Sequence, residues 1–149
     1  MNIGVRLHDT APGTLEQRLD FARAQGFSCA HLALSKVLPD FPMSDAPRLL
    51  NDDLAGQVRE AFASRNMDCA VLGCYLKLAT QDAEALERTR EIYRAHLKFA
   101  RRIGAGVVGT ETPAAPDLRL DIRTGEGAAS VLPMPIGASS TYTPGSPTL

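Results

Sequence analysis

The feature that most constrains this fold is an alternation of short apolar segments with longer amphipathic ones, repeated over residues 1–112. The longer segments carry apolar side chains at the three- and four-residue spacing of a helix with one buried face. The short segments, which we expect to be β-strands, are 3–7, 29–34, 67–76 and 106–112. The order βαβαβαβ is typical of parallel strands joined by right-handed crossovers, so the sequence predicts an α/β fold.

Residues at the ends of the helical segments are of types that start or stop a helix. Thr14 and Gln17 have the spacing of a capping box, in which each side chain accepts a hydrogen bond from an amide at the helix start. Gly26, Asn66 and Gly104 each stand between a helix and the next strand, and these three exits are alike. The later helices are expected to begin at Asn51 or Asp52 and at Thr80 or Asp82.

Two further expectations concern single segments. A polar loop containing Pro39, Pro42 and Pro47 is expected between the second strand and the second helix. The longest helix is expected to pack through one stripe, which consists of Leu86, Thr89, Ile92, Tyr93, His96, Leu97, Ala100 and Ile103.

The pattern stops after Thr112. Six of the ten prolines lie in residues 113–149, a stretch rich in Gly, Ser and Thr that has neither helical nor alternating periodicity. Such a segment buries too little apolar surface to offset the entropy of ordering it. We therefore expect two regions: an α/β domain over 1–112 and an irregular or disordered tail over 113–149.

Composition excludes several classes of protein. Lys and Arg number 16 against 17 Asp and Glu, a net charge of -1, so the chain has no basic excess for binding nucleic acid. No stretch approaches the roughly 20 apolar residues of a membrane-spanning helix. The three cysteines leave one unpaired, and Cys69 and Cys74 lack the C-x-x-C spacing. This usage favours a reducing compartment, and we expect a cytoplasmic location.

Candidate functional residues follow from where ligands gather in parallel α/β folds, which is at the carboxyl ends of the strands. The first strand ends at His8, the third at Cys74 and Tyr75, and the fourth at Glu111. An imidazole, a thiol, a phenol and a carboxylate at one edge suit a polar, hydroxylated or anionic small molecule. Glu111 is the residue best placed to accept a proton.

Each candidate has a structural alternative. His8 is equally suited to capping its strand, Glu111 to an ion pair with a loop, and Cys74 to packing as a small apolar side chain. His31, within a strand, and His96, on an apolar helical stripe, are expected to be structural histidines. No group of His, Cys, Asp and Glu has the spacing of a complete metal site.

Two architectures fit the pattern: an open, doubly wound sheet and part of a (β/α)8 barrel. The first strand is followed by no G-x-G-x-x-G and no P-loop, which weakens the nucleotide-binding version. Four segments then carry a family resemblance, namely 2–9 (NIGVRLHD), 26–27 (GF), 72–76 (LGCYL) and 104–111 (GAGVVGTE). In these segments the chain resembles the first half of a sugar phosphate isomerase/epimerase, of the xylose isomerase-like TIM barrel group.

The resemblance implies an eight-stranded barrel that binds a divalent metal (Mn, Mg, Co or Zn) and isomerises or epimerises ketoses or related polyols by proton transfer. In that family the metal ligands come from the fifth to eighth strands, so none is carried over and we expect this chain alone to bind no metal. The positions that match are His8, Cys74 and Tyr75, as contacts to a carbohydrate-like substrate, and Glu111, as a catalytic residue.

Because a complete barrel takes about 250 residues, we expect a truncated or frame-shifted product with weak or no activity of its own. A non-catalytic domain that binds a small molecule or a partner is the alternative, and a doubly wound binding protein is a third. Half a barrel leaves its first and last strands unpaired, so we expect a homodimer to form through these open edges.

Overall fold

In the computed structural model, the residues that the structure describes are 3–76 and 82–110. They contain a parallel sheet of strands β1 (Gly4–Arg6), β2 (Cys29–Leu32), β3 (Asp68–Gly73) and β4 (Val107–Gly109). The spatial order is β1-β2-β3-β4, the same as the order in the chain. A doubly wound sheet reverses direction part-way, so that alternative is wrong and the fold is the first half of a (β/α)8 barrel.

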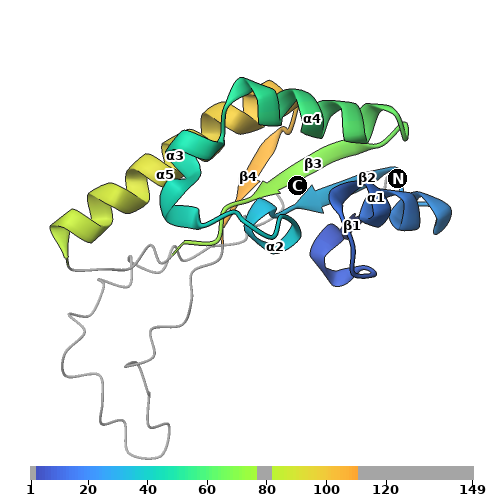
Figure 1. Cartoon of the computed structure of the whole chain (residues 1–149), viewed down its shortest axis with the longest axis horizontal. Coiled ribbons are helices and arrows are strands. Elements are labelled where there is room, and N and C mark those ends of the chain that lie inside the picture. The colour runs from blue at the N-terminus through green and yellow to red at the C-terminus, as the bar shows by residue number, and fades with distance from the viewer. Residues whose placement is uncertain (1–2, 77–81, 111–149) are drawn as a thin grey trace, which may run out of the picture. The chain divides into compact units, whose positions relative to one another are not determined.

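Three long helices cover one face of the sheet. They are α1 (Leu15–Ala24), α4 (Asp52–Ala63) and α5 (Ala83–Ile103). Helix α4 contacts both α1 and α5, and Figure 1 shows α4 and α5 lying on the same side of β3 and β4. Their inward side chains form one core with Leu32 and Leu72 of the sheet, both fully buried. Within the described ranges, no helix is both long enough and apolar enough to cross a membrane.

The predicted helix starts are confirmed. The Thr14 amide donates to Gln17 Oε1 at 2.9 Å, and the Gln17 amide donates to Thr14 Oγ1 at 3.3 Å, which completes the capping box of α1. Of the alternatives left open for the other two helices, Asn51 caps α4 and Asp82 caps α5, each through a side-chain oxygen that accepts from helix amides.

The three helix exits are also alike in the structure. Gly26, Asn66 and Gly104 have φ values of 90°, 51° and 79°, in the left-handed region. After each of them, the next amide returns to a carbonyl five residues earlier: Phe27 to Ala22, Met67 to Phe62 and Ala105 to Ala100, at 2.9–3.2 Å. This is the hydrogen bond of the Schellman motif, which satisfies the last carbonyls of a helix before the chain enters a strand.

Three expectations are wrong in detail. Leu34 does not extend β2 but opens α2 (Leu34–Val37). The segment expected to be a polar loop contains η2 (Met43–Asp45) and α3 (Ala46–Leu49), which holds Pro47 in its first turn, where the missing amide costs nothing. On α5, Phe99 is fully buried whereas Leu97 is 48% exposed, because the buried face is centred on His96, Phe99, Ala100 and Ile103.

A β-bulge interrupts the pairing of β2 with β3. Ala30 pairs with Cys69, but His31 pairs with Val71, so Ala70 is an extra residue without a partner in β2. Side chains alternate along a strand, so the extra residue resets the alternation. Cys69 and Leu72 therefore both reach the core, and Val71 and Gly73 share the opposite face with His31.

The first strand ends in a short 3-10 helix, η1 (Leu7–Asp9), which carries His8. Glu111, the distal part of the predicted fourth strand and the predicted tail at 113–149 lie outside the described residues.

Candidate functional site

Three polar rings from three successive strands meet at the carboxyl edge of the sheet. His8 follows β1, His31 belongs to β2, and Tyr75 follows β3. The ring centres are 5.8 Å apart for His8 and His31, 5.9 Å for His8 and Tyr75, and 6.0 Å for His31 and Tyr75. The Tyr75 hydroxyl and His31 Nε2 are 3.4 Å apart. We call these three residues the ring cluster.

Arg6, the last residue of β1, contacts two members of the ring cluster, His8 and Tyr75. Its Nη2 donates to His8 Nε2 at 2.9 Å and approaches the Tyr75 hydroxyl at 3.5 Å. Its Nε also forms an ion pair with Asp9 Oδ2 at 3.2 Å. Because a guanidinium only donates hydrogen bonds, His8 Nε2 is the acceptor and the proton of the neutral ring lies on Nδ1.

The neutral imidazole of His8 can therefore donate a hydrogen bond from Nδ1. Burial lowers the pKa of its imidazole, and the positive charges of Arg6, Lys36 and Arg18 lower that pKa further, against the opposing effect of Asp9. Its Nδ1 is buried and has no hydrogen-bond partner among the described residues. A buried N–H without an acceptor is costly, so an acceptor supplied by a ligand or by water would stabilise this arrangement.

Gly73 makes room for the cluster. A Cβ atom at this position would collide with Nε2 of His31 and lie 3.1 Å from Cβ of Ala33. The backbone of β3 can approach the His31 imidazole this closely only because residue 73 has no side chain.

Cys74 is not part of the ring cluster. It follows Gly73, whose side-chain direction is toward His31, so alternation turns the Cys74 side chain away from His31, and it is fully buried. Its amide donates to the Gly109 carbonyl at 2.7 Å, which continues the ladder between β3 and β4. Burial raises the pKa of the Cys74 thiol to about 12, so the thiol stays protonated at neutral pH and is a weak nucleophile.

Of the predicted site residues, the structure thus brings His8 and Tyr75 together and separates Cys74 from them, while Glu111 lies outside the described ranges. His31, expected to be structural, belongs to the cluster instead. The signal for it in the sequence was the alternation within 29–32 (CAHL), where His31 stands between the apolar Ala30 and Leu32. In the structure, Ala30 and Leu32 are fully buried, whereas Cys29 and His31 are half-buried. A polar residue on the open side of a strand, near its carboxyl end, is a site candidate. His96 is a structural histidine, as expected: it is 1% exposed and its Nδ1 bonds the Ile92 carbonyl.

A second buried polar atom lies at the carboxyl edge, next to β4, the outer strand opposite to β1. Thr110 follows β4, and its Oγ1 has no hydrogen-bond partner among the described residues. Among the described residues, hydrogen-bonding groups without partners thus follow both β1 and β4, and a polar ligand at this edge would supply partners to them.

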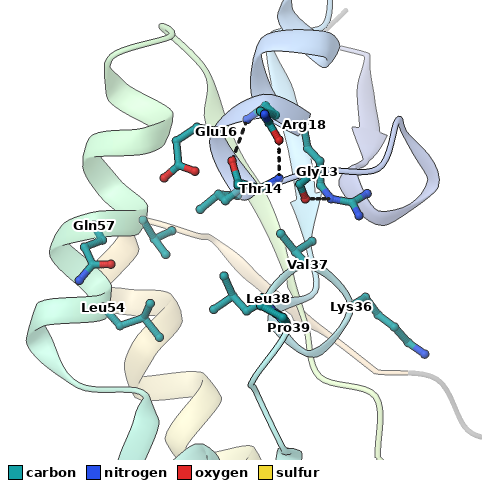
Figure 2. A pocket seen from close by; sticks show the side chains of 13 residues that line it. Gly13, Thr14, Glu16, Arg18, Lys36, Val37, Leu38, Pro39, Leu54 and Gln57 are labelled. Atoms are coloured by element: carbon teal, nitrogen blue, oxygen red, sulfur yellow. Dashed lines mark hydrogen bonds between the residues drawn. The ribbon is translucent and has the colours of Figure 1, made fainter.

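A separate groove of about 670 Å³ lies between the start of α1, α2 and α4 (Figure 2). Its floor is apolar, with Leu15, Val37 and Val58, and its rim includes Glu16 and Gln57. Arg18 connects the groove with the ring cluster, because its Nε donates to the Gly13 carbonyl in the groove and its Nη1 to the Leu7 carbonyl beside His8. None of the ring-cluster residues lines it.

The described residues do not fit a divalent metal. Within ranges 3–76 and 82–110, no three His, Cys, Asp or Glu side chains converge as a ligand set. In the ring cluster, Nε2 of His8 already accepts from Arg6, and the nearby Asp9 carboxylate is paired with the same guanidinium. These groups are therefore already engaged in a hydrogen bond and an ion pair with Arg6.

Comparison with known proteins supports the fold. No protein-family model and no curated protein matches the sequence. Among solved structures, the chain is similar to a D-psicose 3-epimerase crystallised in the presence of D-fructose, with a TM-score of 0.57 and 13% identity. The match covers 86% of this chain and 46% of that chain, so the chain spans about half the length of this neighbour. A likeness at this identity supports the fold, half of a (β/α)8 barrel.

Proposed function

We propose that this chain is the substrate-binding half of a sugar isomerase- or epimerase-type barrel, and that the ring cluster binds a ketose or a similar polyol. The observation that carries the proposal is the convergence of His8, His31 and Tyr75, from three strands, at the edge where barrels of this fold bind ligands. The likeness to an epimerase solved with D-fructose supports the choice of a sugar as ligand.

The chemistry of the cluster suits hydroxyl and carbonyl groups. The Tyr75 hydroxyl both donates and accepts, His8 Nδ1–H donates, and Arg6 donates. A polyol presents hydroxyl groups that each donate and accept, and one of them would accept from the buried His8 Nδ1–H. Proton transfer beside a carbonyl needs a base as well, and Glu111 is the residue that we propose for this role, on its position in the sequence after Thr110.

The test is binding of D-fructose and D-psicose to the full chain, measured by saturation-transfer NMR and calorimetry. Tyr75→Phe removes one hydroxyl from the ring cluster and should weaken binding about 3- to 10-fold, the effect of losing one hydrogen bond. Tyr93→Phe removes the corresponding hydroxyl from α5, remote from the cluster, and serves as the matched control. The proposal fails if neither ketose binds, or if both variants bind as the unaltered chain does.

Ketose turnover, measured with and without added Mn²⁺, distinguishes an enzyme from a non-catalytic binding domain. Binding with no turnover under any condition would leave the sugar-binding function in place and remove the catalytic one.

A further inference from the structure

His8 is carried by η1, a 3-10 turn that is too short to be stable by itself. The turn has three residues, and no side chain caps its start. It is closed by a hydrogen bond from the Thr10 amide to the Leu7 carbonyl at 3.2 Å. Short 3-10 turns have poor hydrogen-bond geometry and little stability of their own. The position of the His8 side chain therefore depends on what else holds this turn.

Two side chains hold the turn at the Leu7 carbonyl. This oxygen accepts from the Thr10 hydroxyl at 2.6 Å and from Nη1 of Arg18, on α1, at 3.1 Å. A hydrogen bond from a charged guanidinium is stronger than one between neutral groups. Leu7 itself is fully buried. The first residue of η1 is thus fixed from two directions, by the residue after the turn and by the neighbouring helix.

Arg18 is fixed in turn by a second carbonyl. Its Nε donates to the Gly13 carbonyl at 3.0 Å, as Figure 2 shows. Gly13 has a φ of 145°, and a Cβ atom there would collide with Oε1 of Gln17, the side chain that completes the capping box. One guanidinium therefore links the turn before α1 with the turn after β1. Its rigid fork of donors suits two separate carbonyls, whereas a lysine offers a single point charge.

The Leu7 carbonyl bears directly on the direction of the His8 side chain. The carbonyl belongs to the planar peptide group that joins Leu7 to His8, so any movement of its oxygen rotates the group to which His8 is attached. The His8 side chain is 10% exposed and lies beside the rings of His31 and Tyr75. Rotation of this peptide group would therefore move the imidazole out of these contacts.

We propose that Arg18 and Thr10 are positioning residues for the ring cluster, and that they hold the imidazole of His8 in place through the Leu7 carbonyl. Neither side chain has to touch a ligand for this role. The consequence for ketose binding rests on the proposed function, because a displaced His8 no longer completes the sugar site. The placement of the imidazole itself can be measured without any ligand.

The ionisation of His8 reports on its position. The charged groups around the ring are Arg6 and Asp9 from its own segment, Arg18 from α1 and Lys36 from α2; burial lowers its pKa most, the three cations lower it further, and Asp9 raises it. A ring that is displaced from the cluster is less buried, so its pKa rises. Its Nε2 also leaves Arg6, so the proton of the neutral ring is no longer confined to Nδ1.

NMR of the full chain without ligand measures both properties for each of the three imidazoles. Thr10→Val removes the hydroxyl and changes no charge, and Arg18→Met removes the guanidinium. Both should raise the pKa of His8 and lower the fraction of its Nδ1–H form, while His96 titrates as before. Arg18→Lys keeps the charge without the fork and should restore these properties only in part. Arg23→Met, an exposed position in the last turn of the same helix, is the matched control and should alter neither.

Binding of D-fructose to the same variants is the second measurement. Arg18→Met should weaken binding about tenfold, and Thr10→Val about threefold, in line with the loss of one charged and one neutral hydrogen bond. Arg23→Met should bind as the unaltered chain does. Urea unfolding shows that each variant is folded under these conditions. A loss of stability alone would leave the pKa and the tautomer of His8 in the folded chain unchanged.

A His8 ring that is unaltered in either Thr10→Val or Arg18→Met overturns the proposal, because both side chains are held to be needed. Full restoration by Arg18→Lys also overturns it, because Arg18 would then act through its charge alone. If the unaltered chain binds no ketose while the NMR results are as expected, the proposed function fails and the positioning of His8 stands.

Discussion

At the amino end of the sheet, three helices pass into strands through the same hydrogen-bonded turn, whereas at the carboxyl end each described strand is followed by something different. The amino end has left-handed residues at Gly26, Asn66 and Gly104, each followed by a backbone hydrogen bond that closes the turn. The carboxyl end has η1 after β1 and a helix soon after β2, and it has polar rings in contact. It also holds the two buried polar atoms that lack partners among the described residues.

The difference indicates that the amino end of the sheet contributes to the stability of the fold, whereas the carboxyl end carries the groups that can bind a ligand. Repetition with complete hydrogen bonding serves the stability of the fold. The varied segments at the carboxyl end contain hydrogen-bonding groups without partners among the described residues. These groups destabilise the free protein slightly and are available to a ligand. This division matches the general rule for barrels, in which the carboxyl face carries the site. Changes at the two ends should therefore affect different measurements.

The largest effect is expected from a pair of glycine substitutions. Gly104→Ala forces a side chain into the left-handed region and should lower the free energy of unfolding by about 1–2 kcal/mol. Gly56→Ala, inside α4 with open space around the new Cβ, should raise it by about 0.5–1 kcal/mol. Urea unfolding at a fixed chain concentration measures both, and sugar binding should change in neither. Equal effects of the two substitutions would show that the exit turn carries no special stability.

A glycine at the carboxyl end should behave differently. Gly73→Ala places a Cβ against His31 Nε2, so the imidazole must move and its contact with Tyr75 is lost. We expect ketose binding to weaken about tenfold, equivalent to about 1.4 kcal/mol. Gly106→Ala, where a Cβ meets no atom within 4 Å, is the control and should bind normally. If Gly73→Ala binds as tightly as the control, the ring cluster is not the ligand site.

The smallest effect concerns pH, and it compares a histidine of the site with one of the core. Burial lowers the pKa of both His8 and His96 below the unfolded value of about 6.5. The unfolded chain therefore binds more protons, and the folded state loses stability as the pH falls below about 6.5, by at most about 1.4 kcal/mol per pH unit for each histidine. Urea unfolding at pH 7.5, 6.5 and 5.5 measures this slope.

His96→Gln should reduce that slope, because it removes the more deeply buried of the two imidazoles. Ketose added in excess should steepen the slope through His8 if the bound sugar accepts from the neutral ring. A slope that is flat in this range would mean that neither imidazole stays neutral in the folded protein.

Much of the fold was readable from the sequence because the signals are local. The capping box of Thr14 and Gln17 and the three helix exits depend on residues within one turn of each other, and all are found in the structure. The parallel direction of the strands followed from the alternation of strands and helices. The strand order was left open between two architectures, and only the structure decided it. The short helix at Ala46–Leu49 was missed because prolines signal loops, although Pro47 also suits the first turn of a helix.

The site was readable only in part because its composition depends on contacts between strands. His8 and Tyr75 were found from their positions after apolar segments. His31 was passed over because a histidine within a strand is usually structural, and nothing local shows which rings lie beside it. Cys74 and Tyr75 are adjacent in the chain, and only the pairing of β2 with β3 decides which of the two joins His31.

That decision rests on the bulge at Ala70. With an uninterrupted ladder, every residue after position 70 would turn to the other side of the sheet, and the thiol of Cys74 would take the place of the Tyr75 phenol beside His31. Leu72 would leave the core at the same time. The single unpaired residue Ala70 thus determines which of two adjacent side chains lies beside His31, the thiol of Cys74 or the hydroxyl of Tyr75.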